Sequence, residues 1–181
     1  MAIIVRHTEE SGAPRAQVTP LEDGVYTGVC IGVFDVGMQH NEKFNKTSRK
    51  GFLFFEVDEL IEDEGAYKGK RYVVHKEFTL SFHPKATLRK TLDVWMGGID
   101  DADGVVEFDL ESLVGQSAMI TVANTKSEAT GRVYTNIMNI TKLPKKTEAL
   151  EVQHTDFEAP PFVKQIAARQ IQQESVKQTK I

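Results

Sequence analysis

The chain has 181 residues, of which 40% are hydrophobic and 27% are charged, and its formal net charge is −4. These values fit one globular domain with a core and a tail, and they exclude a disordered or fibrous chain. The single cysteine, Cys30, excludes an intrachain disulfide, and the absence of a membrane-length or signal-like apolar stretch leads us to expect a cytoplasmic protein with no membrane contact.

The first predicted strand is long and rich in glycine. Residues 1–23 are mostly polar, and we interpret them as an N-terminal arm. Residues 24–37, GVYTGVCIGVFDVG, alternate with period two and predict a strand. Its glycines Gly24, Gly28 and Gly32 indicate a bend, as at the corner of a small barrel that the strand shares between two halves.

Two aromatic-rich runs form the centre of the predicted domain. Residues 38–50 are polar and lysine-rich, and they predict a loop. Within residues 51–82, two runs with β-branched neighbours lie on either side of an acidic stretch that contains Gly65. This pattern predicts two antiparallel strands joined by a turn.

A change of period marks the only helix predicted inside the domain. Leu88, Leu92 and Trp95 recur at i, i+4 and i+7. Pro84 suits a helix start and Gly97 suits its end. We therefore predict a helix of about three turns, with Trp95 as a core residue.

The rest of the chain predicts two more strands and a tail. Residues 108–115 predict a short helical turn, and residues 116–124 and 132–143 predict strands. From residue 145 the composition becomes mixed and contains proline, which indicates a linker. Apolar residues at helical spacing then predict a weak amphipathic helix or a flexible tail.

Five strands with a helix between the third and fourth match the order of an OB-fold, a partly open Greek-key barrel. We therefore expect a mainly β protein with an arm at 1–23, an OB-fold domain at 24–144, and a linker with a weak C-terminal helix or tail at 145–181. In this fold, oligonucleotides lie across strands two and three, flanked by the loops that join strands one to two and four to five. Those loops are residues 38–50 and 124–132.

Charge is segregated onto the two loops. Residues 38–50 carry four cations against one acid, a balance of +3, and residues 124–132 carry two against one, a balance of +1. Exposed rings beside cations suit single-stranded nucleic acid, because bases stack on rings and cations pair with phosphates. The alternative is an ordinary hairpin whose rings all belong to the core.

Strand parity selects the candidate rings. Phe52 and Phe54 alternate with Leu53 and Phe55, so we expect the first pair to face a groove if the second pair faces the barrel. Their alanine variants should then weaken DNA binding without unfolding the domain. On the second strand of this pair, the candidate residues alternate in step with apolar residues. The sequence therefore does not determine which face of that strand the candidates occupy. The candidate DNA-binding residues are Lys43, Phe44, Lys46, Arg49, Lys50, Phe52, Phe54, Arg71, Tyr72, Lys76, Lys126, Arg132 and Tyr134.

A family resemblance extends over residues 20–143. It is carried by the runs GVYTGVCIGVFDVGMQ, GFLFFEVDE, KRYVVHKEFTLSFHPKATLRKTLDVW, FDLESLVGQSAMITV and GRVYTNIMNI. Together they resemble a family of bacteriophage-encoded OB-fold proteins that act as single-stranded DNA-binding proteins. The resemblance implies sequence-tolerant binding that protects single-stranded DNA during phage DNA replication and recombination, in the cytoplasm of the host. It supplies no residue map.

The segment DFEAPPF, residues 156–162, resembles the acidic, apolar-tipped tail with which bacterial single-stranded DNA-binding proteins recruit partners. Here the segment is internal and is followed by basic residues. Two interpretations therefore stay open. Either the segment recruits replication or recombination proteins, or it is a linker to a helix that docks on the domain.

Other classes of function have weaker support. The five histidines are scattered without metal-ligand spacing, and the sequence contains no phosphate-binding loop or nucleophile elbow. We therefore expect no enzyme, no cofactor and no metal. The alternative function is a non-catalytic OB-fold module for protein interaction or assembly. Homo-oligomerisation and the site size are left open.

Overall fold

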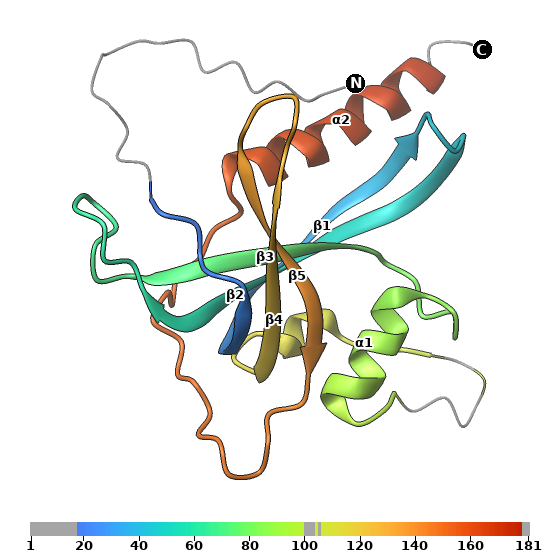
Figure 1. Ribbon diagram of the computed structural model, residues 1–181. Helices are drawn as coiled ribbons and strands as arrows, with labels where there is room; N and C mark the ends of the chain where they lie inside the picture. The colour runs from blue at the N-terminus through green and yellow to red at the C-terminus, as the bar shows by residue number, and fades with distance from the viewer. Residues whose placement is uncertain (1–17, 100–103, 105, 179–181) are drawn as a thin grey trace.

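Five antiparallel strands form a single sheet in the order β3-β2-β1-β4-β5 (Figure 1). The computed structural model describes residues 18–99, 104 and 106–178, with the side chains of the last helix described as far as Arg169. The strands are β1 (Gly24–Asn41), β2 (Lys46–Leu60), β3 (Arg71–Thr79), β4 (Ser117–Lys126) and β5 (Val133–Thr141). The helices are α1 (Thr87–Met96), the 3-10 turn η1 (Leu110–Leu113) and α2 (Pro161–Gln178). The predicted mainly β class is confirmed, with α1 between the third and fourth strands; of the predicted N-terminal arm, residues 1–17 lie outside the described part.

Strand β1 joins the two halves of the sheet. Its first residues pair with β4, whereas the stretch from Gly28 to Asn41 pairs with β2, with register shifts near Gly32 and Gly37. Glycine is required at position 28, because a Cβ there would lie 2.6 Å from Cγ1 of Ile120 on β4. The predicted sharing of one strand between two partners is confirmed.

The predicted loop of residues 38–50 is mostly strand. β1 continues to Asn41 and β2 begins at Lys46, so only residues 42–45 form a turn, with Asn45 at a positive φ of 45°. The prediction was wrong because a two-stranded ribbon exposed on both faces needs backbone pairing but no apolar alternation. Several predicted loop cations therefore lie on strands.

The main core lies between the sheet and α1. Leu53, Phe55 and Val57 of β2 face it, together with Leu88, Leu92 and Trp95 of α1, as the helical spacing predicts. The Nε1 of Trp95 donates to the carbonyl of Ser117 at 2.8 Å, so the indole is both buried and hydrogen-bonded. Gly97 ends α1 in the left-handed conformation, as predicted, whereas the helix begins at Thr87, after Pro84.

A second apolar cluster lies on the opposite face of β2. It contains Phe52 and Phe54 from β2, Phe162 and Val163 from α2, and Phe157 from the stretch before α2. Residues 150–169 are called the C-terminal segment. The predicted C-terminal helix is thus present and packs along β1 through its apolar residues (Figure 1). No helix in the described part of the chain is long and apolar enough to cross a membrane.

Candidate nucleic-acid interface

Phe52 and Phe54 lie on the face of β2 opposite the main core, as strand parity predicts, but they are not exposed. Their exposed fractions are 5% and 2%. The ring of Phe157 lies 5.2 Å from that of Phe54, and the ring of Phe162 lies 5.7 Å from that of Phe52, measured between centroids. The expectation of an open stacking surface is therefore wrong for these two rings, because the C-terminal segment covers them.

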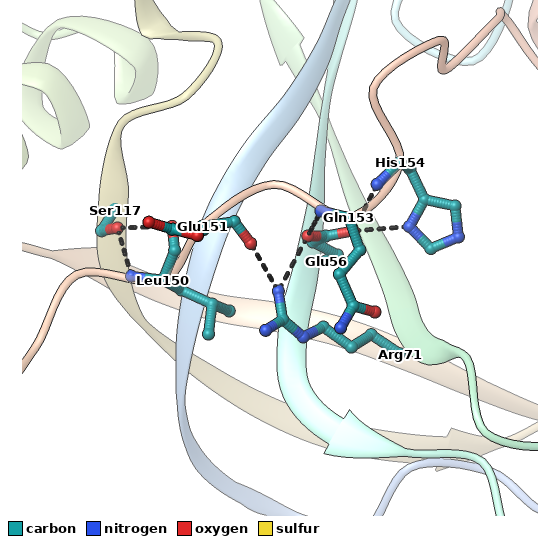
Figure 2. A network of polar contacts seen from close by, with 7 residues as sticks. All are labelled: Glu56, Arg71, Ser117, Leu150, Glu151, Gln153 and His154. Carbon is teal, nitrogen blue, oxygen red and sulfur yellow. Dashed lines mark hydrogen bonds and ion pairs between the residues drawn. The ribbon is translucent and has the colours of Figure 1, made fainter.

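A buried carboxylate fixes the start of this segment to the sheet (Figure 2). Glu56, on the same face of β2, has no exposed side-chain surface. It accepts hydrogen bonds from the backbone N–H groups of Gln153 (2.5 Å) and His154 (3.2 Å) and lies 2.5 Å from Nδ1 of the His154 ring. Nη1 of Arg71 lies 3.0 Å from the carboxylate and also donates to the Glu151 carbonyl at 2.6 Å. Residues 151–154 are therefore anchored through one acid.

Further polar contacts hold the segment on both sides of this anchor. The Leu150 N–H donates to the Ser117 hydroxyl at 2.9 Å, and the hydroxyl in turn donates to the Leu150 carbonyl at 3.3 Å (Figure 2). Nε2 of Gln39 donates to the Ile166 carbonyl of α2 at 3.1 Å. Residues interpreted from sequence as a linker are thus docked on the sheet.

The Glu56 anchor makes the docking of the segment dependent on pH. Burial alone would raise the pKa of Glu56, but hydrogen bonds from His154, Gln153 and Arg71 outweigh it and hold the pKa below its ordinary value of 4.5. A lowered pKa in the folded state gives a stabilisation that is complete above the ordinary pKa and is lost as the pH falls through the folded-state pKa. We expect proteolysis within residues 150–160 to accelerate as the pH falls below about 5, and Glu56→Gln to abolish that dependence. A Glu56→Gln variant with the same acid response would contradict this assignment.

Strand β3 turns two of the predicted residues away from the face of Phe52 and Phe54. Tyr72 and Lys76 share the parity of Val74 and Phe78, which are buried in the main core. The Tyr72 hydroxyl donates to the Thr19 carbonyl at 2.8 Å, and Nζ of Lys76 donates to the Ile137 carbonyl of β5 at 2.9 Å. With Arg71 bound to Glu56, none of the three predicted β3 residues projects beside Phe52 and Phe54 as an open contact.

The β3 residue that does lie beside these rings is His75, which sequence reasoning missed. It is the register partner of Phe54, and its ring stacks on that of Phe54 at 5.0 Å with an interplanar angle of 27°. Packing among rings lowers the pKa of His75 by desolvation, although the side chain as a whole remains exposed. Only the strand register, which the sequence did not define, could have identified it.

The β1–β2 hairpin presents an exposed ring with cations. Phe44, at the tip, is 69% exposed, and Nζ of Lys43 lies 5.4 Å from its ring centroid. Lys43 and Lys46 are exposed and have no ion pair within the described residues. Arg49, in contrast, is paired with Asp35, and Lys50 lies 3.3 Å from a carboxylate oxygen of Glu77. The tip therefore keeps its positive charge, whereas the base of the hairpin is partly neutralised.

The β4–β5 hairpin has the same combination. Lys126 and Arg132 flank its turn and are exposed, and neither has an ion pair among the residues that the structure describes. Tyr134, which follows on β5, is 51% exposed. Each of the two hairpins selected from the sequence thus carries one open ring and two available cations.

A groove of about 550 Å³ separates the two edge strands of the sheet. Tyr134 and Asn136 line it from β5, and Val73, His75 and Lys76 line it from β3. The hydrogen bond between Lys76 and the Ile137 carbonyl crosses it. The groove is therefore an open, mixed polar and aromatic channel that begins at the β4–β5 hairpin.

Comparison with known proteins adds no family assignment. No protein-family model matches the chain, and no curated protein matches it. Within the described ranges, no group of three or more His, Cys, Asp or Glu side chains is arranged to hold a metal ion.

Proposed function

We propose that this chain is an OB-fold protein that binds single-stranded DNA in a sequence-tolerant manner and protects it during phage DNA replication or recombination. The observation that carries the proposal is the pair of hairpins, each with an exposed ring and two cations without an ion pair in the described structure. The sheet order and the position of α1 support the OB-fold assignment. The binding surface consists of the two hairpin ends and the groove between β3 and β5.

Each element of this surface has a physical role. Phe44 and Tyr134 offer rings on which bases stack, and stacking contributes ~1–3 kcal/mol per base. Lys43, Lys46 and Arg132 pair with phosphates and release counterions. These side chains read no base edge, so binding should tolerate any sequence and weaken with salt.

We expect the double substitution Phe44→Ala with Lys43→Gln to weaken binding of a fluorescent dT oligonucleotide by roughly 5-fold to 150-fold, the range that corresponds to the removal of one stacked base. The slope of log affinity against log salt should also become shallower by ~0.7 for each phosphate that is no longer neutralised. Fluorescence anisotropy at two or more salt concentrations measures both effects.

The chain offers a matched control for this experiment. Tyr67 is 56% exposed, and Nζ of Lys70 lies 5.5 Å from its ring centroid, which reproduces the ring and cation pair of the hairpin. This pair lies in the β2–β3 connection, at the other end of β2 from the β1–β2 hairpin. Tyr67→Ala with Lys70→Gln should leave both affinity and salt slope unchanged.

The same titration tests the proposal against its alternative. Binding of dT that is absent, or equally weak at low and high salt, would contradict single-stranded DNA binding. That result would favour a non-catalytic module for protein interaction or assembly. Duplex DNA and RNA competitors measure the preference for unpaired DNA.

A further inference from the structure

We infer that copies of this chain associate head to tail, with a basic surface on α1 and β5 of one copy docked against an acidic hollow at the start of β3 of the next. The basic surface is defined as Lys76, Lys90, Val94 and Met138. The acidic hollow is defined as Glu22, Glu59, Leu60, Glu62 and Tyr72. The inference concerns association of the protein with itself and does not depend on the proposed function.

The basic surface is built on one stripe of α1. Lys90, Thr91 and Val94 follow one another at helical spacing, and with Met138 of β5 they line a hollow of about 190 Å³ between the helix and the strand. The side chains of Val94 and Met138 are both more than half exposed. Two large apolar side chains thus lie uncovered beside a polar hollow.

A bulge in β5 accounts for the exposure of Met138. Thr121 of β4 pairs with Asn139 and the next residue, Val122, pairs with Ile137, so Met138 has no direct partner. β5 is an edge strand of the sheet, where a bulge changes the direction of a side chain. Methionine is flexible enough to fill an irregular hollow on another molecule. The bulge therefore presents Met138 to a partner.

The charge of this surface selects the kind of partner. Lys76 and Lys90 line the hollow, and no acid does so among the residues that the structure describes. Lys90 is exposed and has no ion pair in the described ranges, whereas the neighbouring acid Asp93 lies 3.1 Å from Nε of Arg89. Apolar side chains beside free cations suit a partner surface that combines apolar side chains with acids.

The acidic hollow has this combination. It measures about 400 Å³, and no lysine or arginine lines it within the described part of the chain. Leu60 lies in its lining and is half exposed. Burial and then nearby carboxylates raise the pKa of Tyr72 above its ordinary value of 10.0, as a negative environment requires. Three exposed carboxylates complete the lining without an ion pair in the described structure, those of Glu22, Glu59 and Glu62.

The two surfaces lie at opposite ends of the domain, with the β2–β3 connection on the left of Figure 1 and α1 on the right. β3 runs between them, from Arg71 beside Leu60 to Thr79 before α1. Each copy therefore presents one surface to the copy before it and the other to the copy after it. Such a contact leaves a free surface at either end, so association continues beyond a dimer.

Sedimentation velocity of the full chain without DNA tests this contact. From micromolar to millimolar protein, we expect species beyond a dimer that grow with concentration and diminish with added salt. Lys90→Glu and Glu62→Lys, both at exposed positions, should each weaken association at least about tenfold, because like charges then face each other. Lys146→Glu and Glu148→Lys make the same charge changes on the exposed connection before α2 and should associate as the unmodified chain does.

Mixing Lys90→Glu protein with Glu62→Lys protein is the decisive step. Each variant keeps one intact surface, so the mixture should associate although neither variant does so alone. A monomer at every concentration, a dimer that grows no further, or a mixture that stays monomeric would overturn the inference. Since DNA is absent throughout, a failure to bind dT would overturn the proposed function and leave this inference standing.

Discussion

Replacing Phe54 with alanine is expected to lower the free energy of unfolding by about 3–5 kcal/mol, as for other fully buried phenylalanines. The side chain is 2% exposed and packs against the rings of Phe34, His75 and Phe157. Its removal leaves a cavity beneath the C-terminal segment and also reduces the apolar surface that folding buries. Urea unfolding followed by circular dichroism measures the effect as a lower midpoint.

Phe44→Ala is the matched control, since the same chemical change is made at a ring that is 69% exposed. Its free energy of unfolding should stay within about 0.5 kcal/mol of the unmodified value. The two variants thus separate a ring needed for stability from a ring proposed to bind DNA. An unchanged midpoint for Phe54→Ala would mean that the C-terminal segment does not cover the ring in solution.

The second large effect is expected for Glu56→Ala. Removal of one partner from a buried ion pair typically costs about 3–5 kcal/mol, because the remaining charge stays desolvated without compensation. The side chain of Arg71 is only 13% exposed and would lose its acid, and the N–H groups of Gln153 and His154 would lose their acceptor. Thermal unfolding should therefore begin at a markedly lower temperature.

Glu59→Ala supplies the comparison for this variant, since Glu59 lies on the same strand with an exposed side chain. Its thermal midpoint should match that of the unmodified chain. Equal midpoints for Glu56→Ala and Glu59→Ala would exclude the network around Glu56 as an anchor of the C-terminal segment.

The sequence identified those elements whose pattern depends on local periodicity. The spacing of Leu88, Leu92 and Trp95 predicted the buried face of α1, and alternation predicted that Phe52 and Phe54 point away from the main core. Turn chemistry and charge located the two hairpins correctly, although the β1–β2 ribbon is longer than its polar residues suggested.

The features that the sequence missed depend on packing between distant segments. The sequence did not predict which face of the sheet each β3 residue occupies. Tyr72 and Lys76 share a parity with apolar residues, and the pairing of β2 with β3 shifts in register between Glu56 and Leu60. The docking of residues 150–162 was missed because the segment has no helical or alternating pattern. Its position is set by Glu56, about a hundred residues earlier in the chain.

The chain contains a single tryptophan, Trp95, and its indole lies in the main core, on the side of the sheet away from the C-terminal segment. Its intrinsic emission should therefore report the integrity of the main core and should not respond to bases stacked on Phe44 or Tyr134. An oligonucleotide should saturate the protein without quenching this emission, so a large spectral change on addition of DNA would signal rearrangement of the core itself.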